Sequence, residues 1–246
     1  MKSLEIEAHG STDIGQLRSR NEDSFLVDSA LHLYAVADGM GGHRNGAEAS
    51  AGAIAALVDE MARLKQQPDS AGFDHDVEHV IAKVNDSVFE LNRSKGQHDG
   101  SGMGTTLVGM MVDLSSCTST LFNVGDSRAY LYRKRSLTQL TRDQTVYQEW
   151  IDGGGIGPEP GRNLILQGIG LVPEITPKVD HVQLDRADMI ILCSDGLNGS
   201  INDQKIAQIL SENHSEPPFL IVERLIDAAN AAGGEDNISV VVLKVH

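Results

Sequence analysis

Acidic side chains beside glycine or asparagine adjoin three strongly apolar stretches of the chain. Asp38-Gly39 and Asp195-Gly196 each follow a strand-like run, and Asp236-Asn237 opens the last one. A carboxylate at the end of a buried strand is held rigidly, and an adjacent glycine lets the backbone approach a ligand closely. Carboxylates that converge without His or Cys form an oxygen site suited to Mg²⁺ or Mn²⁺. The pattern therefore predicts a carboxylate metal centre of the kind that performs phosphoryl chemistry.

The same dipeptides have a simpler interpretation. Asp-Gly and Asp-Asn are common turn formers, so any one of these carboxylates taken alone is equally well explained as a turn residue. Three of them, each beside a strongly apolar strand, favour the metal centre. A fourth acidic group, Asn21-Glu22-Asp23, lies near the start of the chain.

Composition restricts the class of protein. The chain has 246 residues, 40% of them hydrophobic, which is enough for one sizeable domain. Its net charge of −15 argues against a nucleic-acid partner, which would normally meet a basic face. Two isolated cysteines, Cys117 and Cys193, suggest a reducing compartment, and neither an apolar leader nor an 18-residue apolar run is present. We therefore expect a cytoplasmic protein without a membrane partner.

Hydrophobic periodicity predicts the elements that must position these carboxylates. Strands are predicted over 31–37, 105–112, 119–124, 129–133, 189–193 and 238–245, and helices over 47–64, 77–91, 145–151, 203–210 and 218–232. Glycine and proline predict a turn at 39–42, loops at 66–74 and 96–104, and a mobile surface loop at 153–161. Helices come in blocks between runs of strands, which favours an α+β fold with antiparallel sheets.

Six motifs follow one another in an order typical of a known family. They are Gly15-x-x-Arg18-x-x-Asn21-Glu22-Asp23, Asp38-Gly39-Met40-Gly41-Gly42-His43, Gly102-Met103-Gly104-Thr105-Thr106, Val124-Gly125-Asp126-Ser127-Arg128, Cys193-Ser194-Asp195-Gly196-Leu197 and Gly234-x-Asp236-Asn237. Their order resembles the metal-dependent protein phosphatases (the protein phosphatase 2C-like Ser/Thr phosphatases), in their bacterial branch. The resemblance implies one catalytic domain over residues 1–246, with a central antiparallel β-sandwich flanked by α-helices on both faces.

The resemblance also implies a ligand set for two Mn²⁺ or Mg²⁺ ions. Asp38 would bridge the ions and the Gly39 carbonyl would bind one of them, while Asp195 and Asp236 would complete the other. Glu22 and Asp23 would act mainly through water. Asp126 resembles the family's ligand for a weaker third ion, shared with Asp195.

Arg18 resembles the family's phosphate-binding arginine. A planar cation in a carboxylate site can hold two phosphate oxygens at once. The sequence alone favours a solvated surface arginine, and the resemblance reverses that preference. Arg18, Asp38 and Asp195 are therefore the candidate catalytic residues.

The expected reaction is direct hydrolysis. Water bound by two divalent cations loses a proton near neutral pH, and the resulting hydroxide attacks phosphorus in line with the leaving Ser or Thr oxygen. A cysteine-nucleophile phosphatase would need an arginine six residues after the cysteine, but Gly199 and Asn123 stand there. Eukaryotic relatives place a histidine directly after the Asp-Gly pair, where this chain has Met40, so the general acid is left open between His43 and a metal-bound water.

We therefore expect a protein-serine/threonine phosphatase that acts on a phosphorylated protein as a monomer and opposes a bacterial Ser/Thr kinase. The alternative is a catalytically silent phosphopeptide-binding adaptor of the same fold. Such an adaptor would be expected to have lost Asp38, Asp195 or Asp236, and all three are present. A phosphatase of an anti-anti-sigma factor would share the chemistry but normally carries a sensor domain.

Overall fold

The computed structural model describes residues 4–41, 45–66, 73–95 and 102–246. Two five-stranded antiparallel sheets form its centre. Sheet I has the order β1 (Ile6–Asp13), β12 (Ile238–Val245), β11 (Met189–Cys193), β8 (Arg128–Arg133) and β9 (Ser136–Gln139). Sheet II has the order β10 (Lys178–Gln183), β7 (Thr118–Val124), β6 (Leu107–Asp113), β3 (Leu33–Ala37) and β2 (Ser24–Asp28).

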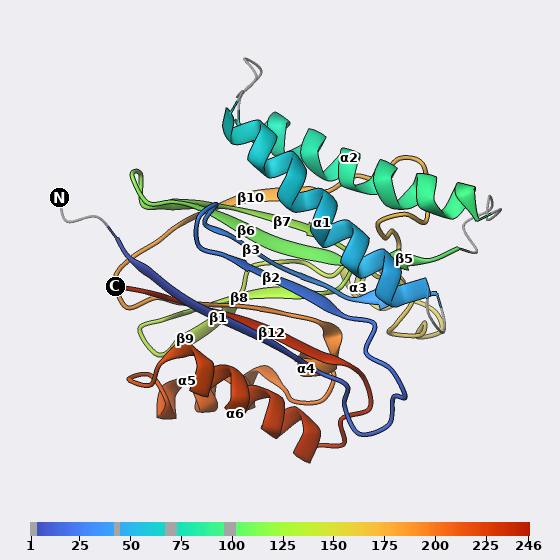
Figure 1. Ribbon diagram of the computed structural model, residues 1–246. Helices are drawn as coiled ribbons and strands as arrows, with labels where there is room; N and C mark the ends of the chain where they lie inside the picture. Colours follow the sequence, from blue (N-terminus) through green and yellow to red (C-terminus); the bar gives the residue numbers. More distant parts are fainter. Residues whose placement is uncertain (1–3, 42–44, 67–72, 96–101) are drawn as a thin grey trace.

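Helices cover the outer faces of both sheets (Figure 1). Helices α1 (Asn45–Gln66) and α2 (Phe73–Ser94) lie over sheet II, while α5 (Asp203–Glu212) and α6 (Pro218–Ala231) lie over sheet I. The short helix α4 (Asp195–Asn198) follows β11, and α3 (Val146–Asp152) begins at Thr145, whose side chain accepts a hydrogen bond from the Gln148 amide. The predicted α+β sandwich with helices on both faces is confirmed.

The central strands are apolar on both faces because each face packs against another layer. In β11, Met189, Ile191 and Cys193 pack under the helices, whereas Ile190 and Leu192 face the other sheet. Strand β3 divides in the same way, with Tyr34 and Val36 between the sheets. A strand buried on both faces reads as a continuous apolar run, which is why the sequence predicted these strands.

Four strands of the two five-stranded sheets were not predicted: β1, β2, β9 and β10. They are the four outer strands of the two sheets. An outer strand pairs on one side only and is partly open to water, so it needs no apolar run. In β10, for example, only Val182 is buried.

The predicted loops need smaller corrections. Gly39–Met40, predicted within a turn, forms β4 and pairs with β5 (Gly104–Thr105), which was predicted partly as loop. The predicted 66–74 loop is shorter, because α1 includes Gln66 and α2 begins at Phe73. Most of this loop, residues 96–101 and residues 42–44 lie outside the described part of the chain.

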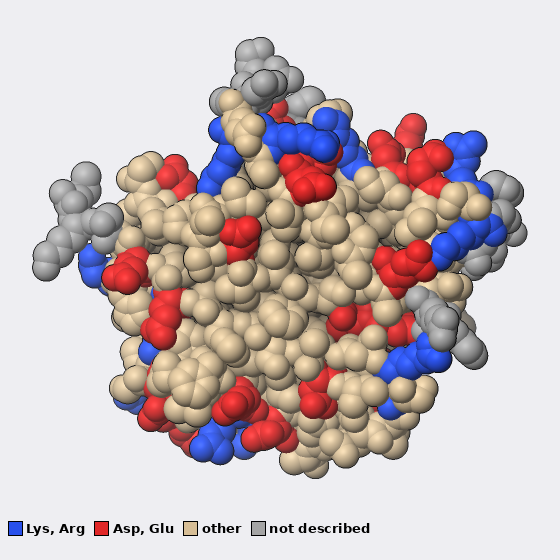
Figure 2. All heavy atoms as spheres, in the orientation of Figure 1, with Lys and Arg blue, Asp and Glu red and all other residues tan. Residues whose placement is uncertain are grey.

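The surface agrees with an acidic protein. Figure 2 shows Lys and Arg interspersed with Asp and Glu on one face, without an extended basic area. Among the described helices, none combines the length and apolar character needed to cross a membrane.

Candidate metal centre

Four aspartates meet at one end of the sandwich because five strands begin or end there. Asp38 follows β3, Asp195 follows β11, Asp126 lies between β7 and β8, and Asp236 precedes β12. All four line one open cavity of about 500 Å³. Arg18, Glu22 and Gly39 line the same cavity. The structure therefore brings six of the seven predicted metal ligands to one space, although they span more than 200 positions of the sequence.

The seventh, Asp23, lies just beneath the cavity. It is 8% exposed, and its Oδ2 accepts a hydrogen bond of 2.8 Å from the hydroxyl of Ser194. Its Oδ1 is buried and has no hydrogen-bond partner among the described residues. Burial raises the pKa of Asp23 to about 6.

The pKa values of the other carboxylates are also raised, first by burial and then by the neighbouring negative charges. Burial, followed by the charges of Asp23, Asp195 and Asp126, raises the pKa of Asp38 well above its usual range. Burial and the charge of Asp195 raise the pKa of Asp126 to about 7. Burial and the charge of Asp236 raise the pKa of Asp195. Carboxylates this close cannot all ionise without a compensating cation.

The glycines beside these aspartates are required by close packing. A Cβ on Gly39 would overlap the carbonyl oxygens of Glu22 and Gly46, and one on Gly196 would overlap the carbonyl oxygen of Asn237. The Asp-Gly pairs thus allow strand ends and neighbouring loops to approach the cavity without a side chain between them.

Three polar residues hold this arrangement, and the sequence reasoning assigned them no role. Asn237 accepts from the Glu22 amide at 2.8 Å and donates to the carbonyls of Ile14 and Arg20, both at 2.9 Å. Thr106 Oγ1 accepts from the Asp38 amide at 3.1 Å. Ser194 joins Asp23 to the amide of Ser239. All three lie inside the six sequence motifs described above, and that position could have pointed to their role.

Arg18 points to the acidic cluster. Its Nη2 lies 2.6 Å from Oδ2 of Asp236, and its side chain remains 55% exposed. A guanidinium at the rim of a carboxylate cavity can meet an incoming anion while remaining attached to the site.

Within the described residues, no group of three or more His, Cys, Asp or Glu side chains is arranged so that it could hold a metal ion as it stands. Asp236 is held by Arg18 and Asp23 by Ser194. The donor set nevertheless fits a hard divalent cation, because it consists of oxygen atoms, carries repelling charges and includes the unpartnered Oδ1 of Asp23. The predicted ligand roles stay predictions, and His43 lies outside the described residues.

A second cavity adjoins the first and shares Asp126, Asp195 and Asp236 with it. In its wall, Arg128 holds Asp143 through two hydrogen bonds, of 2.8 and 2.6 Å. Arg162 lies 4.5 Å from the ring centre of Tyr147 in the same wall. The predicted loop 153–161 follows α3 and contains no helix or strand, and its mobility stays a prediction.

Known proteins are similar to this chain in sequence and in fold. Residues 16–217 match the family model described as protein phosphatase 2C. The serine/threonine phosphatase stp of Listeria monocytogenes is 32% identical over 97% of this chain and 96% of its own length. The serine/threonine protein phosphatase PstP of Mycobacterium tuberculosis is 36% identical over 99% of this chain, which corresponds to 46% of that longer protein.

A solved structure extends the comparison to the fold. The catalytic domain of a serine threonine protein phosphatase PstP, in complex with two manganese ions, has a TM-score of 0.84 and 32% identity, covering 99% of both chains. The family match and these relatives show that the chain belongs to the protein phosphatase 2C family.

Proposed function

We propose that the acidic cavity hydrolyses phosphoserine and phosphothreonine in proteins by direct attack of water on phosphorus. The protein is a metal-dependent serine/threonine phosphatase of its family. The observation that carries the assignment of the site is the convergence of Asp38, Asp126, Asp195 and Asp236 on one cavity with Arg18 at its rim.

The proposed ligand set follows from this convergence. Asp38 shares the cavity with the other carboxylates, whose charges act on it, and is proposed to bridge two ions. The Gly39 carbonyl, Asp195 and Asp236 are proposed as further ligands. Glu22 and Asp23 would orient water, and Asp126 would help to hold a weaker third ion. When bound, Mn²⁺ or Mg²⁺ lowers the pKa of water and so supplies the nucleophile.

Arg18 is the proposed substrate-binding residue. Its fork of donors now faces Asp236 at 2.6 Å, and the same fork matches two oxygens of a phosphate. Binding the phosphate from the rim would orient the phosphorus toward the carboxylate cluster.

The physiological setting is also a proposal. A phosphorylated Ser or Thr must be made by a kinase, so a Ser/Thr kinase is the expected counterpart. We propose a monomer in the cytoplasm, in line with the free thiols of Cys117 and Cys193. No observation favours the silent adaptor, since the acidic residues that it would be expected to lack are present.

Hydrolysis of a phosphothreonine peptide in Mn²⁺ and in EDTA tests the activity. We expect turnover only with metal. We expect Asp195→Asn to reduce it by more than the roughly 10–100-fold typical of groups that merely orient ligands. Asp227→Asn, on the exposed face of α6, removes the same charge far from the cavity and should match the wild type. Full turnover in EDTA would contradict the proposal.

A further inference from the structure

The loop that carries Arg18 has no packing of its own. Residues 14–20 follow β1, form neither helix nor strand, and bury none of their side chains. Leu17, although apolar, is 71% exposed. A segment without buried apolar contacts is held in place by its hydrogen bonds alone. The position of the Arg18 guanidinium therefore depends on the groups that bind the backbone of this loop.

That backbone is bound to the turn that contains Asp236. The carbonyl oxygen of Gly234 accepts from the Gln16 and Leu17 amides, at 2.7 and 3.3 Å. Gly15, at φ 79°, lies so close to the same turn that a Cβ on it would overlap the carbonyl oxygen of Asp236. The loop and the turn therefore touch through their backbones.

One buried side chain joins this turn to both ends of the loop. Asn237 donates from its Nδ2 to the carbonyl oxygens of Ile14 and Arg20, both at 2.9 Å. Its Oδ1 accepts from the Glu22 amide at 2.8 Å. Both donor hydrogens and the oxygen of the amide group are thus in use, which fixes its orientation. Asn237 in turn fixes the two ends of the loop, with Arg18 between them.

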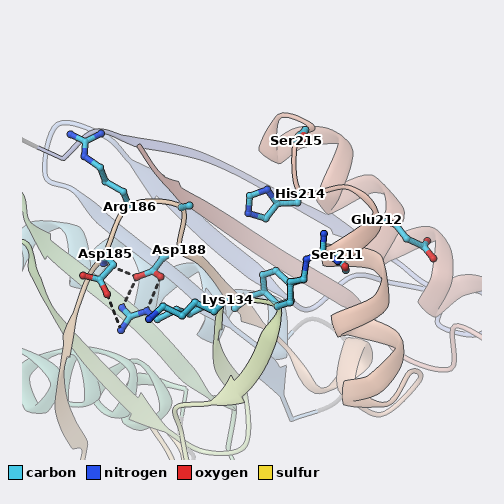
Figure 3. A pocket seen from close by; sticks show the side chains of 12 residues that line it. Lys134, Asp185, Arg186, Asp188, Ser211, Glu212, His214 and Ser215 are labelled. Carbon is cyan, nitrogen blue, oxygen red and sulfur yellow. Dashed lines mark hydrogen bonds and ion pairs between the residues drawn. The ribbon is translucent and has the colours of Figure 1, made fainter.

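Arg18 keeps donors for a ligand. Its only hydrogen-bond partner among the described residues is Asp236, which Nη2 reaches at 2.6 Å. Arg133, in a pocket of about 410 Å³, is bound more fully: it donates to both carboxylate oxygens of Asp188, at 2.8 and 2.6 Å, and lies 3.4 Å from Asp185 (Figure 3). A guanidinium bound in that way serves the fold. Because Arg18 is bound through one nitrogen, its use to a ligand depends on where the loop holds it.

We propose that Asn237 is the positioning residue of Arg18. By joining both ends of the loop to the turn beside Asp236, it directs the guanidinium toward the phosphate of the substrate. Arg18 binds that phosphate, and Asn237 acts through Arg18. Holding a binding group in the right geometry matters, because a displacement of about 1 Å can cost up to 100-fold in rate. The inference rests on the proposed function, since it takes Arg18 as the phosphate-binding residue.

A double-mutant cycle with Arg18 tests the proposal, using the full chain, a phosphothreonine peptide and saturating Mn²⁺. We expect Asn237→Ala to raise KM roughly tenfold, and by no more than Arg18→Ala does, while kcat changes less. In the Arg18→Ala background the same substitution should change KM by less than about twofold, because the group that it misplaces is already gone. An equal rise of KM in both backgrounds would overturn the proposal, since Asn237 would then act through the metal site or through the fold.

Asn85 provides a matched control. This buried asparagine donates to the carbonyls of Val172 and Pro173, at 3.0 and 3.2 Å, and accepts from the Gly170 amide at 2.8 Å. Asn85→Ala therefore removes the same set of bonds outside the lining of the catalytic cavity. It should lower Tm about as much as Asn237→Ala does and keep the wild-type KM. A KM raised equally in Asn85→Ala would overturn the proposal, because lost stability alone would then explain the effect.

Gly15→Ala displaces the loop from its own side, and it decides the question if Asn237→Ala does not fold. The new Cβ would overlap the carbonyl oxygen of Asp236, so the loop must move away from the turn while every carboxylate stays. KM should rise, and again only when Arg18 is present. Hydrogen exchange in EDTA gives a readout that does not depend on turnover. The amides of Gln16 and Leu17 should exchange faster in both variants than in the wild type.

The outcome for Arg18→Ala separates this inference from the proposed function. A raised KM in Arg18→Ala, with wild-type KM and wild-type exchange in Asn237→Ala and Gly15→Ala, would overturn the inference alone. A wild-type KM in Arg18→Ala itself would overturn the proposed role of Arg18, and the inference with it.

Discussion

At the scale of single residues, Arg18 separates a substrate-binding role from a purely structural one. Its guanidinium is paired with Asp236, a proposed metal ligand, at 2.6 Å. Oδ2 of Asp236 cannot bind a metal ion and Arg18 at full strength at the same time. Metal binding should therefore free the fork of Arg18 for the substrate phosphate, and removal of Arg18 should not weaken the metal site.

We expect Arg18→Ala to lower kcat/KM for a phosphothreonine peptide, mainly through KM. Hydrogen bonds to charged groups contribute roughly 1.5–3 kcal/mol, which corresponds to about ten- to a hundredfold. Arg18→Lys should recover only part of the loss, because an ammonium lacks the planar fork. Steady-state kinetics together with metal-binding calorimetry measures both effects. Arg20→Ala, in the same cavity wall, is the matched control, and wild-type kinetics in Arg18→Ala would remove Arg18 from the site.

At the scale of elements, a buried asparagine joins α2 to the strands that carry the site. Asn92 is 3% exposed and donates to the carbonyls of Met103 at 2.7 Å and Gly170 at 2.8 Å, while its Oδ1 accepts from the Met103 amide at 2.9 Å. Met103 directly precedes β5, which leads to Thr106 and its hydrogen bond to Asp38. The helix thus helps to fix a carboxylate that it does not touch.

Asn92→Ala should lower the free energy of unfolding by about 2–4 kcal/mol, because several buried groups lose their partners together. Urea denaturation measures the change. Ser87→Ala on the same helix removes one exposed hydrogen bond to the Lys83 carbonyl and should cost less than about 0.5 kcal/mol. Equal stability of the two variants would show that Asn92 does not hold β5 in place.

At the scale of the whole molecule, the carboxylate cluster is a source of repulsion that a cation should relieve. Asp38, Asp126 and Asp195 all have raised pKa values, and they come from both sheets. A cation bound among them would join sheet I to sheet II at one end. Metal binding should therefore stabilise the entire sandwich and not only a loop.

A hundredfold excess of Mn²⁺ over its dissociation constant should add about 2.7 kcal/mol of stability. For a chain of this size that corresponds to a rise in Tm of about 5–10 °C. Thermal unfolding in Mn²⁺ and in EDTA measures it, with Asp195→Asn expected to reduce the rise and Asp227→Asn to preserve it. Identical Tm values for the wild type in both conditions would argue against a metal site shared by the two sheets.

The sequence by itself determined the elements that are buried on both faces. Runs such as 33–37 and 189–193 are apolar throughout because one face of each packs under helices and the other against the second sheet. The helices over 47–64 and 218–232 were likewise predicted to within a few residues of α1 and α6. The four outer strands were not predicted, because their backbone is ordered by one neighbouring strand and their side chains are partly open to water.

For the site, too, the sequence determined one part and the tertiary structure another. Residue types and motif order indicated an oxygen-ligand metal centre and the family, because the chemistry of a carboxylate beside a glycine is local. Only the tertiary structure brought Asp38, Asp126, Asp195 and Asp236 to one cavity and paired Arg18 with Asp236, 218 positions away. Such pairings depend on which strand ends meet, and that follows from sheet order and packing, which no local pattern encodes.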